Sequence, residues 1–253
     1  MSPRNLPFLL LILAATTAWS QERKKLTNES GDKYSRTVET WYVLKTDPEV
    51  KDGPYQKAYN GKVILTGFYT HGQKDSVWED YASNMFKRTL VTRKKYTQGK
   101  MTGKWEIFNW KGEPEYTYDF NNGVLTYPEN HKADTTTFFY MTATGDWVRT
   151  SLDKNPIPLY GSGEWLSYLN RSFRYPDDAV NNEIQGTVII SMIVDEKGNA
   201  SDYAVFKSVA PSLDQEALRV VSSFEHRFVP AEKDGKKVKS LYLRTVTFKL
   251  EKG

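Results

Sequence analysis

The chain has 253 residues, a formal net charge of +4 and no cysteine, and aromatic residues make up 14% of it. The lack of cysteine excludes disulfides, thiol catalysis, cysteine-based zinc sites and a lipid-modified N-terminal cysteine. A net charge this small does not by itself indicate a nucleic-acid partner, and we predict none. The many Tyr and Trp residues favour β-structure, because flat rings pack well on a pleated surface.

Residues 1–20 have the pattern of a secretory signal peptide. An apolar run from Leu6 to Ala15 is followed by Ala18-Trp19-Ser20, which matches a small-x-small cleavage site. The alternative is a retained membrane anchor, but the run is shorter than the roughly 20 residues that a spanning helix needs. We therefore expect export to the periplasm, where disulfides are optional, with membrane association only if the signal is retained.

The next part of the chain divides into a polar lead-in and a repeat region. Residues 21–40 have little to bury and are expected to form a flexible lead-in. Within residues 41–147, the segment from Tyr69 to Tyr81 recurs from Tyr96 to Phe108, at an offset of 27 residues. Asn-Gly and similar pairs, such as Asn60-Gly61, supply the turns of tight hairpins. The pattern predicts an all-β repeat domain in which each hairpin buries its row of rings against the next.

From about residue 55 to residue 125 this pattern resembles MORN-type repeats and the related repeats of bacterial antitoxin-like proteins. Some arrays of this type are associated with lipid or protein contacts. Six cations also lie where no acid occurs between Asp80 and Glu106, namely Lys87, Arg88, Arg93, Lys94, Lys95 and Lys100. They predict either a contact with an anionic surface, such as acidic lipid, or the solvated face of two strands.

The last part of the chain predicts a small α+β domain at residues 164–253. Residues 148–163 contain two prolines and two late glycines and are expected to be the linker that precedes it. Apolar spacing and turn residues then predict elements in this order: a lead helix around Trp165 to Leu169, a short helix from Pro176, a strand at 187–194, a hairpin turn at Asp195 to Asn199, a strand from Tyr203 to Val209, a helix from Pro211, and a closing strand from Leu241 to Leu250.

This domain resembles the TonB C-terminal domain family. The residues that carry the resemblance are Tyr175-Pro176, Ala179, Gly186-Thr187-Val188, Val194-Asp195, Gly198, Leu213-Asp214, Glu216-Ala217, Phe228, Pro230-Ala231, Gly235-Lys236 and Phe248. The resemblance implies a three-stranded antiparallel sheet with two helices. It also implies that the last strand accepts an extended segment of an outer-membrane receptor by β-strand addition. The expected partner-binding residues are Arg174, Tyr175, Pro176, Leu241, Leu243, Thr245 and Thr247.

The sequence also departs from the best-known energy transducers of that family. Those proteins keep an uncleaved N-terminal helix with polar residues that couple to an inner-membrane complex, and they carry a long Pro-rich spacer. This chain shows neither feature. We therefore expect the domain to bind receptor segments without delivering energy to the receptor.

Enzymatic activity is not expected, and we predict no catalytic residues, no metal site and no cofactor. His71, His131 and His226 are scattered without ligand spacing to acids. No nucleophile elbow, HExxH motif or phosphate-binding glycine loop occurs. The leading hypothesis is a periplasmic TonB-like protein that docks a receptor or another envelope protein through its C-terminal sheet. The alternative is an envelope scaffold whose repeat array is the binding surface, and both a homodimer and a membrane-surface contact stay open.

Overall fold

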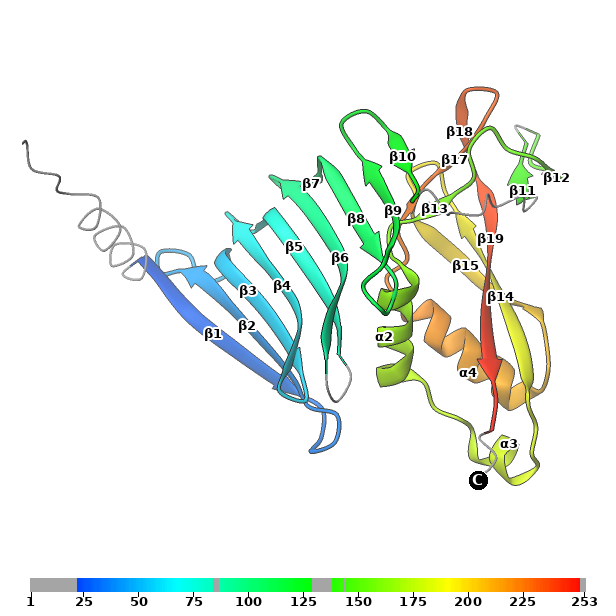
Figure 1. The fold of residues 1–253 in the computed structure, drawn as a ribbon, viewed down its shortest axis with the longest axis horizontal. Coiled ribbons are helices and arrows are strands. Elements are labelled where there is room, and N and C mark those ends of the chain that lie inside the picture. Colours follow the sequence, from blue (N-terminus) through cyan, green and yellow to red (C-terminus); the bar gives the residue numbers. More distant parts are fainter. Residues whose placement is uncertain (1–21, 84–86, 129–137, 143, 251–253) are drawn as a thin grey trace, which may run out of the picture. The chain divides into compact units, whose positions relative to one another are not determined.

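The computed structural model describes residues 22–83, 87–128, 138–142 and 144–250. The chain divides into two compact units, Met1–Pro128 and Glu129–Gly253, and each is described by itself (Figure 1). The predicted signal peptide, residues 1–20, lies outside the described residues. None of the helices in the described part of the chain is long and apolar enough to cross a membrane.

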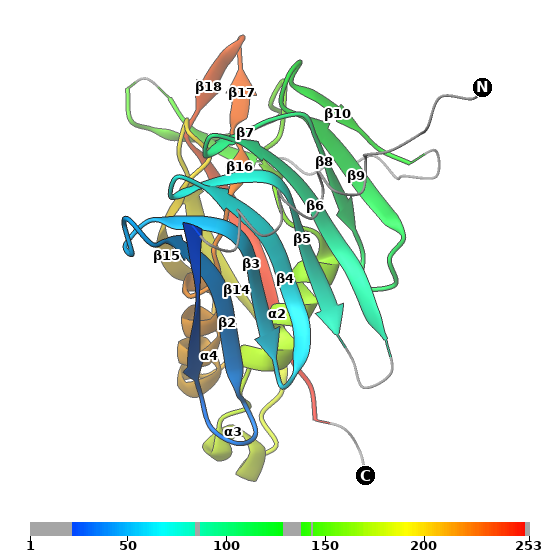
Figure 2. The same ribbon diagram turned by 90° about the vertical axis from the view of Figure 1, so that its left-hand side faces the viewer.

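The N-terminal unit is a ten-stranded antiparallel sheet in which neighbours along the chain are neighbours in the sheet (Figure 2). The one exception to the simple order is β7, which pairs with β6 alone. The strands are β1 (Arg23–Ser30), β2 (Thr37–Leu44), β3 (Lys51–Tyr59), β4 (Lys62–Thr70), β5 (Gln73–Ser83), β6 (Arg88–Thr97), β7 (Lys100–Met101), β8 (Lys104–Phe108), β9 (Pro114–Asp119) and β10 (Val124–Thr126). The predicted hairpins therefore join side by side into one continuous sheet.

Three of the hairpins use the same two-residue turn. The turns are Asn60-Gly61, His71-Gly72 and Gln98-Gly99, and both residues of each have positive φ. Such turns match the right-handed twist of the strands they join, and they require a residue that tolerates positive φ at both positions. The 27-residue offset thus places equivalent turns at residues 71–72 and 98–99.

The repeat also appears in the contacts of the two equivalent tryptophans. Trp78 Nε1 donates to the carbonyl oxygen of Phe68 at 3.2 Å, and Trp105 Nε1 donates to that of Lys95 at 3.0 Å. Both indoles are 2% exposed. A Cβ atom at Gly67 would lie 2.2 Å from the Trp78 ring, so only glycine leaves room for that ring on β4. Each tryptophan also contacts the tyrosine of its own repeat, at centroid distances of 5.0 Å (Trp78) and 5.3 Å (Trp105).

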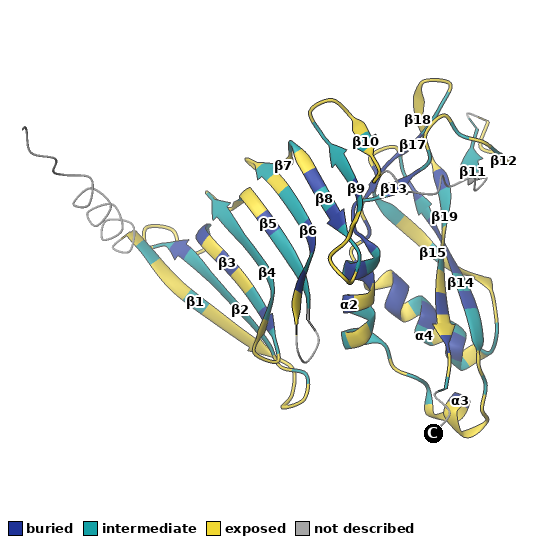
Figure 3. Cartoon of the chain, viewed as in Figure 1, coloured by how far each residue is buried: buried dark blue, intermediate teal, exposed yellow. Residues whose placement is uncertain are grey.

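The prediction of a flexible lead-in at residues 21–40 is wrong for the described residues. β1 pairs with β2 along its whole length, from Arg23↔Leu44 to Ser30↔Thr37. Its side chains are mostly exposed, so the sequence shows no apolar signal there (Figure 3). The buried carboxylate of Asp52 on β3 accepts a hydrogen bond from Arg23 Nε at 2.7 Å, which anchors the start of the strand. A ladder of backbone hydrogen bonds and one ion pair therefore hold a polar strand in place.

The C-terminal unit is built on a five-stranded antiparallel sheet in the order β12-β11-β19-β14-β15. The strands β19, β14 and β15 correspond to the predicted three-stranded sheet. The β11–β12 hairpin, which comes earlier in the chain than the predicted domain, extends this sheet beside β19. The main strands are β11 (Phe138–Met141), β12 (Trp147–Thr150), β14 (Gly186–Val194), β15 (Ala200–Lys207) and β19 (Ser240–Phe248), and the short ones are β13 (Ile157–Pro158), β16 (Phe228–Val229), β17 (Ala231–Lys233) and β18 (Lys236–Val238).

Helices cover one face of this sheet (Figure 1). α2 (Ser162–Ser172) and α4 (Pro211–Ser222) lie on this face, and α3 (Asp177–Asn181) lies beyond the end of β19. Leu213, Val220 and Val221 of α4 are fully buried against alternate residues of the central strand β14, such as Val188 and Ile190. The period of two along the strand and the apolar stripe along the helix thus form a single core.

The prediction of a linker at residues 148–163 is also wrong, because this segment belongs to the C-terminal unit. It contains the end of β12 and the whole of β13, which pairs with β16. Leu159 and Tyr160 are 2% and 3% exposed. Pro158 lies in a short two-stranded pairing rather than in a free connection, and the unit begins at Glu129.

Candidate docking edge

The candidate site is the side of β19 that faces away from β14; β19 is the last strand in the described part of the C-terminal unit. β19 pairs with β14 from Ser240 to Phe248. Val246 and Phe248 point into the core and are buried, whereas Leu243, Thr245 and Thr247 are exposed on the opposite face of the sheet. The strand therefore has one face anchored by the helices and one face open.

The backbone N–H and C=O groups of β19 point alternately toward β14 and away from it. The pairing with β11 shows which residues point away. Met141 N donates to the carbonyl oxygen of Lys239 at 2.9 Å, and Phe139 lies opposite Leu241. Residues two apart in a strand direct their N–H and C=O groups to the same side. The N–H and C=O groups of Leu243, Thr245 and Thr247 thus point away from β14, toward the side that β11 occupies further up. The hydroxyls of Thr187 and Thr247 lie 3.1 Å apart, as expected of a pair without backbone bonds between β14 and β19.

The expectation that the last strand forms the edge along its whole length needs a correction. β11 pairs with β19 at Ser240 and Leu241, so Leu241 is already engaged. The β11–β12 hairpin comes from a stretch outside the predicted domain, which is why the sequence did not reveal it. Among the described residues, no strand pairs with the outer side of β19 from Leu243 to Phe248.

The segment Arg174-Tyr175-Pro176 reaches the far end of the same strand. The Tyr175 ring contacts that of Phe248 edge-on, with centroids 5.6 Å apart, and its hydroxyl donates to the carbonyl oxygen of Ile184 at 2.7 Å. Arg174 is exposed. The predicted segment at residues 174–176 therefore meets the predicted strand at Phe248, through Tyr175. The backbone N–H of Arg174 instead donates to Glu216 of α4.

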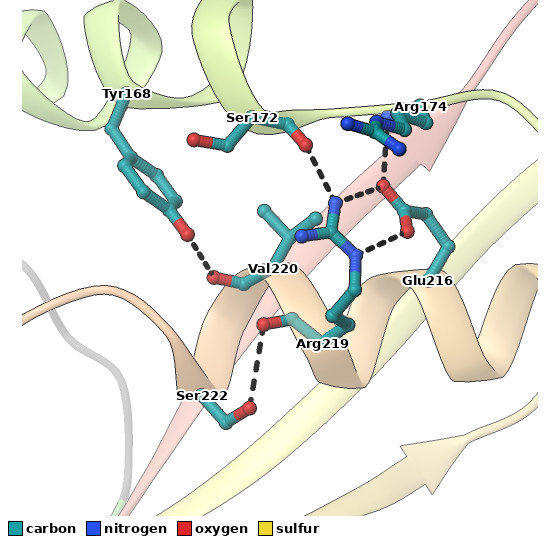
Figure 4. A network of polar contacts seen from close by, with 7 residues as sticks. All are labelled: Tyr168, Ser172, Arg174, Glu216, Arg219, Val220 and Ser222. Carbon is teal, nitrogen blue, oxygen red and sulfur yellow. Dashed lines mark hydrogen bonds and ion pairs between the residues drawn. The ribbon is translucent and has the colours of Figure 1, made fainter. Parts of the chain in front are cut away.

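A polar network on α4 holds this segment (Figure 4). Glu216 accepts a hydrogen bond from the backbone N–H of Arg174 at 2.7 Å and forms an ion pair with Arg219 at 2.8 Å. Arg219 Nη2 also donates to the carbonyl oxygen of Ser172 at the end of α2. Hydrogen bonds of this kind, made by charged groups, lower the freedom of the loop between α2 and α3. Glu216 is thus a structural residue that places Arg174.

A feature that the residue-by-residue prediction missed is Arg244 in the middle of β19. Its guanidinium lies over the Trp165 ring at 4.3 Å from the centroid, and its Nε is buried without a hydrogen-bond partner. The signal was present in the sequence, since Arg244 interrupts the alternating apolar positions Tyr242, Val246 and Phe248. A charged residue at a core-facing position calls for an explanation.

Arg244 also influences a buried pair beneath the sheet. Tyr160 and the Nδ1 atom of His226 are joined by a hydrogen bond of 2.7 Å. Burial lowers the pKa of His226 to about 4; the hydrogen bond to Val221 opposes this shift, and the charge of Arg244 adds to it. Burial raises the pKa of the Tyr160 hydroxyl. Both groups are therefore neutral near pH 7, and they serve packing rather than chemistry.

The six cations of the N-terminal unit do not share one surface. Arg93 and Lys94 are successive residues of β6 and point to opposite faces of the sheet. Arg93 pairs with Glu79 and Glu106, and Lys94 pairs with Asp80. The Arg88 guanidinium lies over the Tyr81 ring at 3.5 Å. Arg93, Lys94 and Arg88 are thus engaged by neighbouring strands, and Lys87, Lys95 and Lys100 are exposed.

The two histidines in the described part of the chain, His71 and His226, lie in different units and are not brought together by either fold. His71 is on an exposed turn and His226 is in the core of the other unit, whereas His131 lies outside the described residues. No group of three or more His, Asp or Glu side chains suited to a metal ion occurs in the described ranges. Asp195 instead accepts hydrogen bonds from Lys197 N and Asn199 N and closes its own hairpin turn.

Comparison with known proteins adds one finding. No curated protein and no solved structure matches the chain. Residues 171–250, roughly a third of the chain, match the family model described as the Gram-negative bacterial TonB protein C-terminal. The matched region spans α3, β14, β15, α4 and β19, together with the Arg174 segment. This match supports a TonB C-terminal domain in residues 171–250 and suggests a TonB-like envelope protein.

Proposed function

We propose that this chain is a non-enzymatic, periplasmic TonB-like protein whose C-terminal sheet binds a segment of a receptor or other envelope protein by β-strand addition, in a role linked to outer-membrane transport. The family match provides the class of partner, because proteins with this domain interact with outer-membrane receptors. The proposal includes a cleaved signal peptide at residues 1–20.

The observation that carries the proposal is the row of outward backbone groups on β19. Leu243, Thr245 and Thr247 present N–H and C=O groups on the side away from β14. An unpaired row of this kind is a template for an added strand. The pairing of β11 with β19 at Ser240 and Leu241 supports this proposal.

The direct test is Thr245→Pro. The N–H of Thr245 points outward, so proline removes a donor from the docking side while the ladder to β14 keeps its bonds. Binding of a receptor-derived peptide, measured by fluorescence polarisation, is expected to fall at least tenfold in a variant whose circular dichroism is unchanged. Thr245→Val is the matched control, since it alters the side chain and keeps the N–H. Equal affinity of the proline variant and the wild type would exclude docking at this edge.

A second candidate function places the binding surface on the ten-stranded sheet. It rests on the exposed cations Lys95 and Lys100 and on the resemblance to MORN-type repeats. The two candidates separate in a pull-down with the units divided after Pro128, which keeps β11 together with β19. Partners retained by residues 21–128 alone would favour the array, and partners retained by residues 129–253 alone would favour the docking edge.

A further inference from the structure

Arg244 lies at the centre of the free part of β19, and its surroundings show what it lacks. Its side chain is partly exposed on the helix-covered face, and Trp165 holds its guanidinium at 4.3 Å from the ring centroid. The Nε atom is buried and has no hydrogen-bond partner. The partly exposed remainder of this side chain, rather than the buried Nε atom, is what an added strand can reach, and its positive charge favours a negatively charged neighbour.

The strands beside β19 do not neutralise this charge. β14 and β11 carry no charged residue, and the nearest strand beyond β11 contributes another cation, Arg149. The stretch from Lys236 to Leu250 contains several cations and no acid, namely Lys236, Lys237, Lys239, Arg244 and Lys249. A positive edge of this kind attracts a negatively charged segment.

Strand geometry fixes where the complementary charge would sit. The N–H and C=O groups of Arg244 point toward β14, so Arg244 forms a pair without backbone bonds with a strand added antiparallel on the other side, the direction in which β11 pairs. Side chains in such pairs are the closest, with Cα atoms about 4.5 Å apart, and they share one face of the sheet. The residue of the visiting strand opposite Arg244 thus lies on the helix-covered face, beside the guanidinium.

We propose that the docked segment carries an Asp or Glu directly opposite Arg244, so that its carboxylate accepts hydrogen bonds from the guanidinium held over Trp165. This inference rests on the proposed docking at β19. The residues flanking the acid lie on the open face beside Leu243 and Thr245, where apolar or β-branched side chains fit best. The partner is therefore an acidic, extended protein segment, and β11 limits how far it extends toward Leu241.

The test is selection of random peptides of about eight residues, which span roughly 27 Å when extended, displayed on phage against the full chain. Wild-type protein is expected to select peptides with Asp or Glu at one fixed position between β-branched or apolar residues. Arg244→Gln is expected to weaken those peptides about tenfold, as loss of a charge-assisted hydrogen bond implies. Arg244→Lys is expected to retain an intermediate affinity, and Arg244→Glu is expected to select Lys or Arg at the same position.

The outcomes separate this inference from the docking proposal. Peptides that lose binding in Thr245→Pro but show no acid preference, and bind Arg244→Gln as well as wild type, would overturn the role of Arg244 and leave edge docking intact. Peptides that bind Thr245→Pro undiminished, or no selected peptides at all, would count against docking at β19. Selection of the reversed charge by Arg244→Glu guards against a trivial loss of folding, because only a folded edge can select.

Discussion

In the ten-stranded sheet a charged side chain faces an opposite charge on the next strand, whereas in the five-stranded sheet Arg244 faces none. Arg93 on β6 lies between Glu79 on β5 and Glu106 on β8, at 2.9 and 3.1 Å. Arg244 on β19 lies opposite Ile190 of the uncharged strand β14, and the described part of β11 ends before reaching it. A charge that is neutralised within its own sheet stabilises that sheet, and a charge left over is available to a partner. This difference is the basis for proposing docking at β19 rather than on the ten-stranded sheet.

The largest expected effect is on the stability of the N-terminal unit, from removing one of the aromatic rings packed along its sheet. Trp78→Ala should lower the free energy of unfolding of the N-terminal unit by about 4 kcal/mol, because it removes a buried indole and leaves a cavity between strands. Hydrogen exchange during urea titration should show faster opening of β4 to β6 and unchanged opening of β14 and β19. Trp110→Ala is the control, since that indole is 53% exposed. A similar small loss in both variants would show that the rings do not hold the array together.

The second expected effect is a pH dependence of stability in the C-terminal unit, which contains the buried His226. The pKa of His226 is lowered to about 4 by burial, against about 6.5 for an unfolded histidine. The unfolded chain therefore takes up a proton below pH 6.5 that the folded C-terminal unit refuses until about pH 4. Its contribution to stability is complete above pH 6.5 and is lost as the pH falls toward 4, by on the order of 3 kcal/mol.

Urea unfolding of the C-terminal unit at pH 7 and pH 4.5 checks this expectation. His226→Phe should flatten the dependence between these two pH values, because no group remains there to take up the proton. His71→Gln is the matched control, since His71 is exposed and Gln98 occupies the equivalent turn position of the next repeat. An equal pH response in wild type and His226→Phe would assign the acid sensitivity to other groups.

Local patterns in the sequence predicted the elements of the C-terminal unit well. Alternating apolar residues gave β14 and the inner face of β19, and the apolar stripe of α4 gave the helix that covers them. The β11–β12 hairpin escaped prediction because its pairing with β19 joins residues about 100 positions apart, and four-residue strands carry too little pattern of their own. The polar strand β1 escaped for a related reason, because the Asp52–Arg23 pair that anchors it is not a periodic signal.

The candidate site was predictable only in part. The resemblance pointed to Leu243, Thr245 and Thr247, whereas the direction of their backbone groups needed the strand register. The sequence shows the cations of β6 only as a run, because Glu79 and Glu106, the acids that pair with Arg93, come from neighbouring strands. Charge patterning along one strand says little when the partners lie across the sheet.

The smallest expected effect tests that neutralisation directly. Arg93→Met should destabilise the N-terminal unit by about 1 kcal/mol or less, because both ion pairs are partly exposed and such pairs contribute little. Lys95→Met, two residues along the same face and exposed, should cost almost nothing. The loss in Arg93→Met should shrink in 1 M salt, where the Debye length falls to about 3 Å. Urea unfolding at low and high salt measures both variants. Identical, salt-independent losses would mean that Arg93 contributes by packing its stem, and the contrast with Arg244 would then rest on geometry rather than on charge.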